Sequence, residues 1–249
     1  MIGHQAVGIS LQSAGDITEG RAHYDQAIAL YDPVEHRPLA TRFGQDSRVV
    51  NLSRRSAALW LLGYPEAALA DAESALRKAR EIGHSATLMY ALSHGAFARY
   101  QCGDYASANA VFDELAALAE EKGTLFWKAF GIMNQGCVRA LTSQPSDAVR
   151  MITSGWQSTG ATMWMPFFLS YLARAHAELG KFEDAWCSIC EAIATIETSK
   201  ERWCEAEVHL IDPQPRNTHR RPQLPGFCLL RTRNRERTLE ICCRSCQTD

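Results

Sequence analysis

Two stretches of this chain share one pattern: Gly103-Asp104-Tyr105-Ala106-Ser107-Ala108 and Gly180-Lys181-Phe182-Glu183-Asp184-Ala185. Each begins with a turn-forming glycine, followed by an aromatic residue two positions later and an alanine five positions later. When the 249-residue chain is aligned on this pattern, turns fall at residues 15, 63, 103, 143 and 180, at intervals of 48, 40, 40 and 37 residues. An internal repeat of this length is typical of a solenoid.

The residues around the turns favour helices. Small residues stand seven positions before every turn, and the segment 64–82 carries an apolar stripe at three- and four-residue spacing. One helix pair cannot bury its own apolar face, whereas stacked pairs share a continuous core. We therefore predict an all-α fold of about five antiparallel helix pairs over residues 1–207. The second helix of the fourth pair is expected to be a turn short, from Ser146 to Ser154, because Gly155 follows.

The order of small residue, glycine turn, aromatic residue and two alanines resembles the tetratricopeptide repeat (TPR) family. That resemblance implies a right-handed superhelix of helix pairs, a TPR-like α-solenoid, whose first helices line a concave groove that binds peptides. The sequence departs from the family in three ways. Its spacing exceeds the usual length of about 34 residues, Gly20 replaces an alanine, and Ser143 stands at the fourth turn.

Four segments are also similar to the helical C-terminal region of a group of bacterial signalling proteins that carry an adenylate/guanylate cyclase or a predicted ATPase portion. They are HRPLATRFGQD (36–46), LWLLGYP (59–65), SYLARA (170–175) and KERWCEAE (200–207). This resemblance, over about residues 3–209, implies a fragment that serves as a non-catalytic protein–protein interaction module. The alternative is the remnant of a cyclase- or ATPase-linked regulator whose catalytic domain lies outside the chain.

The sequence carries none of the common catalytic or nucleotide-binding motifs. The phosphate-binding Gly-x-x-x-x-Gly-Lys-Ser/Thr loop, the Gly-x-Gly-x-x-Gly fingerprint and the His-Glu-x-x-His zinc pair are all absent. We predict no enzymatic activity and no cofactor. Two Cys-x-x-Cys pairs, at 187/190 and 243/246, are separated by 52 residues, more than the roughly 15–20 of a zinc ribbon. Small buried or stray thiols are the favoured interpretation, and a zinc site is the alternative.

The predicted binding site follows from the family resemblance. Positions two, three, six and ten before each turn are expected to face the concave groove. In the third and fifth pairs these are Ser93, Phe97, Tyr100, Gln101, Ser170, Arg174, Ala177 and Glu178. Aromatic, amide and charged groups together suit peptide recognition, while ordinary packing is the alternative for any one of them. Solenoid ends without capping repeats expose apolar surface, so self-association is a second expectation.

Charge divides the chain into two unlike parts. The net charge of −2 predicts no attraction to nucleic acid, no apolar run approaches the roughly 18 residues of a membrane span, and residues 1–15 carry no export signal. We therefore expect a cytoplasmic protein. Residues 211–249, however, hold eight arginines, four acidic residues, four cysteines and no alanine.

The arginine-rich segment 211–249 has three possible interpretations. It could be a basic arm for nucleic acid, a disordered linker, or the product of a frameshift in GC-rich coding DNA, which turns alanine and glutamate codons into arginine, proline and cysteine codons. The frameshift is favoured. We predict that residues 208–249 form a tail, disordered or frameshifted, outside the repeat domain.

Overall fold

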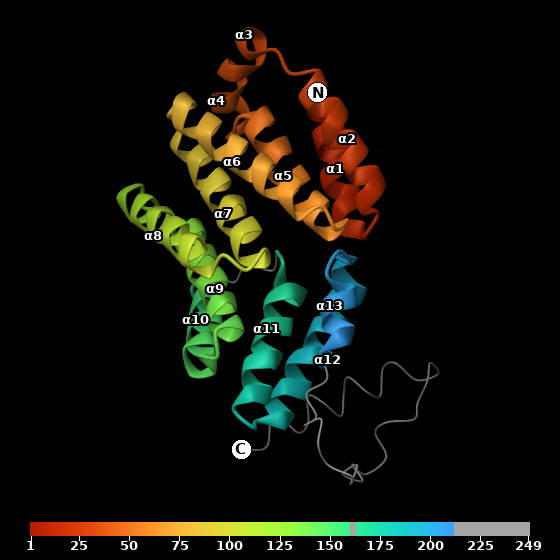
Figure 1. Ribbon diagram of the computed structural model, residues 1–249, viewed down its shortest axis with the longest axis vertical. Helices are drawn as coiled ribbons and strands as arrows, with labels where there is room; N and C mark the ends of the chain where they lie inside the picture. The colour runs from red at the N-terminus through yellow and green to blue at the C-terminus, as the bar shows by residue number, and fades with distance from the viewer. Residues whose placement is uncertain (160–162, 212–249) are drawn as a thin grey trace.

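The computed structural model describes residues 1–159 and 163–211, and every regular element in these ranges is helical (Figure 1). Five helix pairs follow one another along the chain. They are α1 (Ile2–Ala14) with α2 (Ile17–Ala29), α5 (Ser47–Leu61) with α6 (Pro65–Ile82), α7 (Ser85–Gln101) with α8 (Tyr105–Glu121), α9 (Leu125–Leu141) with α10 (Pro145–Thr159), and α11 (Met165–Glu178) with α12 (Phe182–Ser199). The short helices α3 (Pro33–His36), η1 (Arg37–Leu39) and α4 (Ala40–Phe43) join the first two pairs, and α13 (Glu205–Leu210) follows the last.

A left-handed residue separates the two helices of every pair. Gly15, Gly63, Gly103 and Gly180 have φ values between 74° and 97°, and Ser143 has a φ of 53°. Glycine adopts this conformation without the steric cost that a Cβ brings, which is why four of the five turns use it. The next residue then donates its N–H to a carbonyl of the preceding helix, as Asp104 does to Arg99 at 2.9 Å. This bond satisfies a carbonyl that the helix end would leave unpaired.

The pairs stack by one repeated rule. Each first helix contacts the first helix of the next pair, in the order α1, α5, α7, α9 and α11, and each second helix contacts the first helix of the following pair. Such contacts between neighbouring repeats alone define a solenoid. The predicted all-α solenoid of antiparallel helix pairs is confirmed.

One predicted boundary was wrong. Helix α10 continues to Thr159 instead of ending at Ser154. A Cβ atom on Gly155 would lie 2.4 Å from Met133 Cγ and 2.9 Å from the Ala129 carbonyl oxygen. Gly155 therefore stays helical and allows α10 to pack closely on α9, although glycine in a helix costs about 1 kcal/mol relative to alanine.

Helix α13 lies where the first helix of a sixth pair would lie, since it contacts both α11 and α12. It covers α12 only in part. Phe182 and Trp186, two and six positions after the last turn, are 36% and 38% exposed. The equivalent residues of the four earlier pairs are all partly covered. We call Phe182 and Trp186 the α12 end face.

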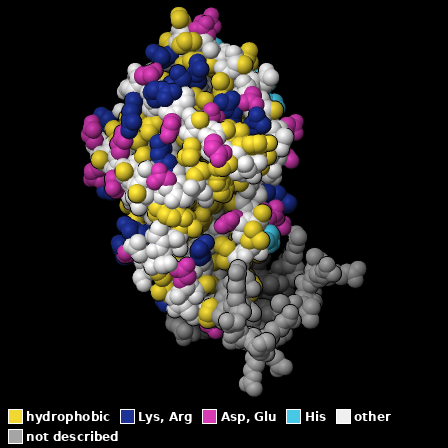
Figure 2. All heavy atoms as spheres, viewed as in Figure 1, with side chains coloured by type: hydrophobic (Ala, Val, Ile, Leu, Met, Phe, Trp, Pro, Cys, Tyr) yellow, Lys and Arg dark blue, Asp and Glu magenta, His cyan; other side chains and the backbone are white. Residues whose placement is uncertain are grey.

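On the face of the molecule in Figure 2, hydrophobic side chains gather across the middle, and charged side chains are concentrated above them. None of the described helices is both long enough and apolar enough to span a membrane. Of the predicted tail, residues 208–210 continue α13 and Val208 is buried, whereas the residues beyond Ile211 lie outside the described part of the chain. The frameshift origin and the domain boundary near residue 207 stay predictions.

Candidate binding site on the concave face

Aromatic side chains fill the concave face of the solenoid. Tyr90, Phe130 and Phe167 stand thirteen positions before the turns of three consecutive pairs, on α7, α9 and α11. Because the first helices contact one another along the stack, these three rings come to the same inner surface. Each of the three is less than 10% exposed.

Trp164 occupies the centre of this surface. It precedes α11 with a left-handed φ of 63°, an unusual conformation for a bulky residue. Its ring centroid lies 5.3 Å from those of Phe97 and Phe130 and 5.7 Å from that of His94, mostly edge to face. Edge-to-face pairs at this distance stabilise packing by about 0.5–1.5 kcal/mol each beyond their burial.

A short segment between α12 and α13, Lys200–Cys204, crosses from the last helix pair to the first. We call it the strap. The N–H of Arg202 donates to the carbonyl of Ser13 at 2.7 Å, next to the α1–α2 turn. Trp203 lies against the concave aromatics, with its ring centroid 5.1 Å from that of Phe167 and 5.2 Å from that of Trp164. The concave face therefore already holds a segment of its own chain.

The Glu201 carboxylate fastens the strap. Its Oε2 accepts a hydrogen bond from the Trp164 N–H at 3.1 Å, and its Oε1 accepts one from Trp203 Nε1 at 2.9 Å. Burial raises the pKa of Glu201, and the two hydrogen bonds and the positive charge of Arg54 oppose that rise. The Trp164 N–H, the Trp203 indole N–H and the charge of Arg54 thus hold the carboxylate at the concave face.

Arg54 on α5 is the cation of this site. Its Nε donates to the Tyr90 hydroxyl at 2.6 Å, and its guanidinium carbon lies 5.9 Å from the ring centroids of both Tyr90 and Trp164. No described carboxylate comes within ion-pair distance of Arg54, whereas the neighbouring Arg55 bonds both Asp71 and Asp25. Arg54 therefore has guanidinium N–H groups left with which it can bind a negatively charged group.

His94 is held neutral beside this cation. Burial and the charge of Arg54 lower the pKa of His94 to about 3, against a hydrogen bond to the Tyr90 carbonyl that raises it. The imidazole stacks on the Tyr90 ring at a centroid distance of 4.2 Å. Burial also raises the pKa of Tyr90, against the opposing effect of Arg54. The site thus combines one fixed positive charge with neutral aromatic groups.

A narrow cavity lies beside Arg54, with room for about one water molecule. Its walls include Gln12 and Ser13 from α1, Phe97 from α7, and the indoles of Trp164 and Trp203. At this point the strap leaves room for about one water molecule, so a larger ligand beside Arg54 would have to displace it.

The eight predicted groove residues divide into a buried set and a more accessible set. Phe97 and Tyr100 are each 1% exposed, and their rings lie 5.4 Å apart in the aromatic core. Ser93 and Ser170 are buried too, and their hydroxyls donate to helix carbonyls of Tyr90 and Phe167.

The remaining four predicted residues are more accessible. Gln101 at the end of α7 and Ala177 on α11 are partly buried. Arg174 and Glu178 are exposed on α11 and form an ion pair, with 3.7 Å between Arg174 Nε and Glu178 Oε1. A direct role of any of the eight in binding stays a prediction, and only the more accessible set can be reached in this conformation.

Sequence reasoning missed Arg54, Trp164 and the strap. The column of Tyr90, Phe130 and Phe167 could have been found at a fixed offset from the turns. Glu201 and Trp203 carried no such signal, because they follow the last complete pair and their partners are distant in the sequence.

The described residues hold no cluster of three or more metal-ligating side chains. Cys187 and Cys190 lie on α12, and the second Cys-x-x-Cys pair, at 243/246, lies outside the described residues. The zinc alternative therefore stays open.

Comparison with known proteins shows the fold. No protein-family model and no curated protein matches the sequence. The structure is similar to the crystal structure of a Rap protein complexed with competence and sporulation factor, at 18% identity and a TM-score of 0.55, over 82% of this chain and 59% of that one. It is also similar to the crystal structure of the apo form of RapI, at 12% identity and a TM-score of 0.53, over 82% and 73% of the two chains.

These similarities support the assignment of a TPR-like helical repeat. The chain spans 59% of the length of the first of the two neighbours. Neither neighbour links the chain to a cyclase or an ATPase, and that part of the family resemblance stays a prediction.

Proposed function

We propose that this chain is a non-catalytic interaction module whose concave face binds a peptide or a segment of a partner protein. The observation that carries the proposal is the strap itself. Its backbone and side chains are bound on the concave face by aromatic rings, a hydrogen-bond donor and a nearby cation. These are the groups that TPR-like grooves and other peptide-binding surfaces use for recognition.

Two observations support a larger setting for the module. The similarity of four segments to the helical region of bacterial signalling proteins supports a role within a cytoplasmic signalling protein. The Rap protein of the first comparison is complexed with competence and sporulation factor, which supports a ligand-binding role for this fold.

Self-association is the second part of the proposal. The α12 end face, Phe182 and Trp186, is more exposed than the same positions of every earlier pair. A second copy of the chain could cover it, as the next helix pair does within the stack.

The binding proposal is tested with the full chain and a displayed library of random linear peptides. Selected peptides would be synthesised with a photoreactive group and crosslinked to the protein, and the modified residues located by mass spectrometry. We expect crosslinks on the inner surfaces of α5, α7, α9 and α11. Crosslinks confined to the second helices α2, α6, α8 and α10 would refute a concave binding site.

A pair of variants sharpens this test. Trp127 is partly buried on α9, with its ring centroid 6.0 Å from that of Tyr90, whereas Leu125 is 72% exposed two residues earlier. Trp127→Ala should weaken peptide binding by about tenfold or more, as expected for an aromatic anchor. Leu125→Ala should leave the affinity unchanged. Circular dichroism would verify that both variants stay folded.

A further inference from the structure

The strap resembles a bound peptide more than a structural loop. Three of its residues form a compact set of contacts: Glu201 binds the Trp164 N–H, Arg202 binds the Ser13 carbonyl through its backbone, and Trp203 packs on Phe167. Specific side-chain contacts at alternate positions, with backbone hydrogen bonds between them, are typical of an extended peptide in a groove.

The charges of the site are complementary. Glu201 lies close enough to Arg54 for each to affect the pKa of the other, yet the two make no direct ion pair. Arg54 uses its Nε for Tyr90, and the residue also lines the narrow cavity. A carboxylate on a longer or better-placed side chain could reach the remaining guanidinium N–H groups and form the bidentate pair that arginine favours.

The strap is attached only weakly to the first helix pair. The bond from Arg202 to Ser13 is the one backbone hydrogen bond between the described strap residues and α1. Lys200 has a left-handed φ of 63°, which a non-glycine residue adopts only at an energetic cost. Segments with few bonds and local strain open more readily than the helices around them.

We propose that the strap is a displaceable internal occupant of the concave face, and that the ligand replacing it is a peptide with an acidic residue followed two positions later by a bulky aromatic residue. This inference rests on the proposed function and specifies its ligand. The acidic group takes the place of Glu201 beside Arg54. The aromatic residue takes the place of Trp203 between Phe167 and Trp164.

The strap sequence itself provides the probe. A fluorescein-labelled peptide TSKERWSE, which corresponds to residues 198–205 with serine in place of Cys204, would be titrated into the full chain and followed by fluorescence anisotropy. The receptor is the double variant Glu201→Ala/Trp203→Ala, whose own strap no longer fills the site. We expect the peptide to bind the double variant at least about tenfold more tightly than it binds the wild type.

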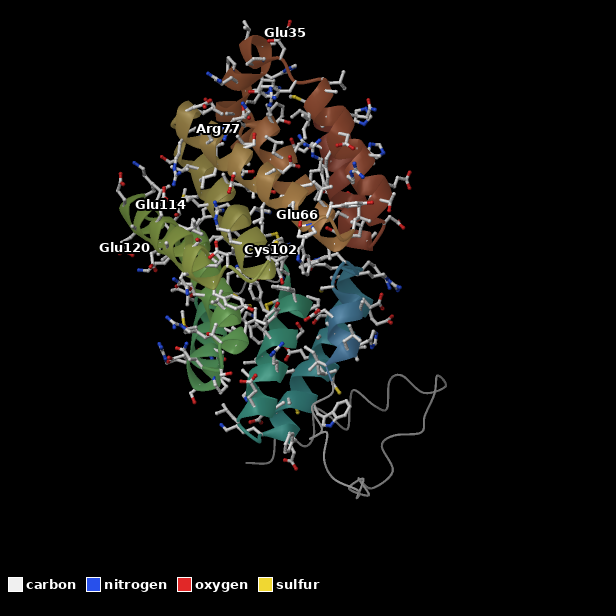
Figure 3. All side chains as sticks on the ribbon, in the orientation of Figure 1. Glu35, Glu66, Arg77, Cys102, Glu114 and Glu120 are labelled. Atoms are coloured by element: carbon white, nitrogen blue, oxygen red, sulfur yellow. The ribbon has the colours of Figure 1, made fainter. Side chains whose placement is uncertain are left out.

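Matched controls assign the contacts. Peptides with glutamine at the Glu201 position, or alanine at the Trp203 position, should each bind the double variant about tenfold more weakly. Adding Arg54→Gln to the double variant should have a similar effect, and adding Arg77→Gln should have none. Arg77 is an exposed arginine on α6, and Figure 3 shows it in the upper part of the molecule, above Glu66 and Cys102. Equal binding to wild type and double variant, or binding to neither, would overturn the proposal.

Hydrogen exchange of the wild-type chain provides a test that needs no variant. The Arg202 and Trp164 amides should exchange faster than the central amides of α11 and α12, through an opening of the strap that leaves the solenoid folded. Exchange of both amides only with global unfolding would make the strap a permanent structural element and refute its displacement. Library peptides that crosslink to the concave face but lack the acidic and aromatic pair would leave the proposed function standing and reject this inference alone.

Discussion

Glu201 accepts a hydrogen bond from the backbone N–H of Trp164, 37 residues earlier in the chain, at 3.1 Å. Each of these residues lies just outside a helix end, Trp164 before α11 and Glu201 after α12. The bond therefore ties the two ends of the last helix pair together, on the side that faces the first pair. This hydrogen bond helps to close the concave face, and helical periodicity predicts neither of the two residues that form it.

Replacing Glu201 by glutamine should weaken this closure. Glutamine keeps one acceptor oxygen, so either the Trp164 N–H or Trp203 Nε1 loses its partner. We expect a loss of about 1–2 kcal/mol in the free energy of unfolding, the usual cost of an unsatisfied buried donor. Urea denaturation followed by tryptophan fluorescence measures it. Glu35→Gln, an exposed acid on α3, should change stability by less than about 0.5 kcal/mol. Equal stability of both variants would remove the fastening role of Glu201.

His94 should make stability depend on pH. Its pKa is about 3 in the folded chain and about 6.5 in the unfolded chain. Between these values the unfolded chain binds the proton and the folded chain does not, so stability falls as pH falls. From pH 7 to pH 5 the loss from this residue should be about 2 kcal/mol.

The measurement compares urea midpoints of wild type and His94→Phe at both pH values. Phenylalanine keeps the stacking on Tyr90 and removes the titration, so the variant should lose about 2 kcal/mol less between pH 7 and pH 5. The same substitution at His209, exposed on α13, should keep the wild-type difference. An unchanged difference in His94→Phe would show that His94 becomes protonated in the folded chain.

Gly155→Ala should destabilise the fourth helix pair. The added methyl group would meet Met133 Cγ and the Ala129 carbonyl oxygen at distances of 2.4 and 2.9 Å, and the backbone oxygen cannot move aside as a side chain can. Overpacking of this kind costs about 1–3 kcal/mol. Gly3→Ala is the control, because nothing lies within 4 Å of its Cβ position on α1. It should stabilise the chain by about 0.5–1 kcal/mol, since alanine favours helices. A stabilising effect at Gly155 would contradict the close packing of α9 and α10.

Ser143→Gly should stabilise the chain. Ser143 holds a φ of 53° at the fourth turn, where the other four turns have glycine. Removing the Cβ relieves about 1 kcal/mol of left-handed strain, less the extra flexibility that glycine gives the unfolded chain. The same change at Ser154, exposed inside α10, should instead destabilise by about 0.5 kcal/mol. Thermal unfolding of the two variants should therefore shift in opposite directions, and a shared direction would reject the strain at Ser143.

The α12 end face should mediate self-association. Replacing both Phe182 and Trp186 by serine removes the exposed apolar surface that a second copy would bury. We expect sedimentation velocity to show a lower proportion of dimer in the double variant than in the wild type at the same concentration. Leu125→Ser, which removes an exposed leucine on α9, is the control and should leave the dimer fraction unchanged. A wild type that stays monomeric at high concentration would contradict the proposal.

The repeat could be found from the sequence because its signals are local. A glycine turn, small residues at fixed offsets and an apolar stripe all lie within about 40 residues of one another. The main helix contacts run within a pair or between neighbouring pairs, so local rules were enough to specify the stack. The error at Gly155 has a related cause, since a glycine that ends a helix and one that allows close helix packing look alike in one sequence.

The predicted groove shows the limit of the same reasoning. The family offsets selected Ser93, Phe97, Tyr100 and Ser170 as inward-facing residues; all four are buried, and a role of each in binding stays a prediction. Burial depends on what else enters the concave face, and here Trp164 and Trp203 enter it.

The sequence by itself determined the helix-pair solenoid, because turn chemistry and helical periodicity act between residues that are close along the chain. Only the tertiary structure decided that the concave face is closed. The contact of Arg202 with Ser13 joins the segment after the last helix pair to the first pair. Glu201 comes to lie beside Arg54 only because each helix pair is rotated relative to the one before it, and these rotations add up along the stack. No local sequence pattern specifies the total rotation, so the occupied groove could be seen only in the folded molecule.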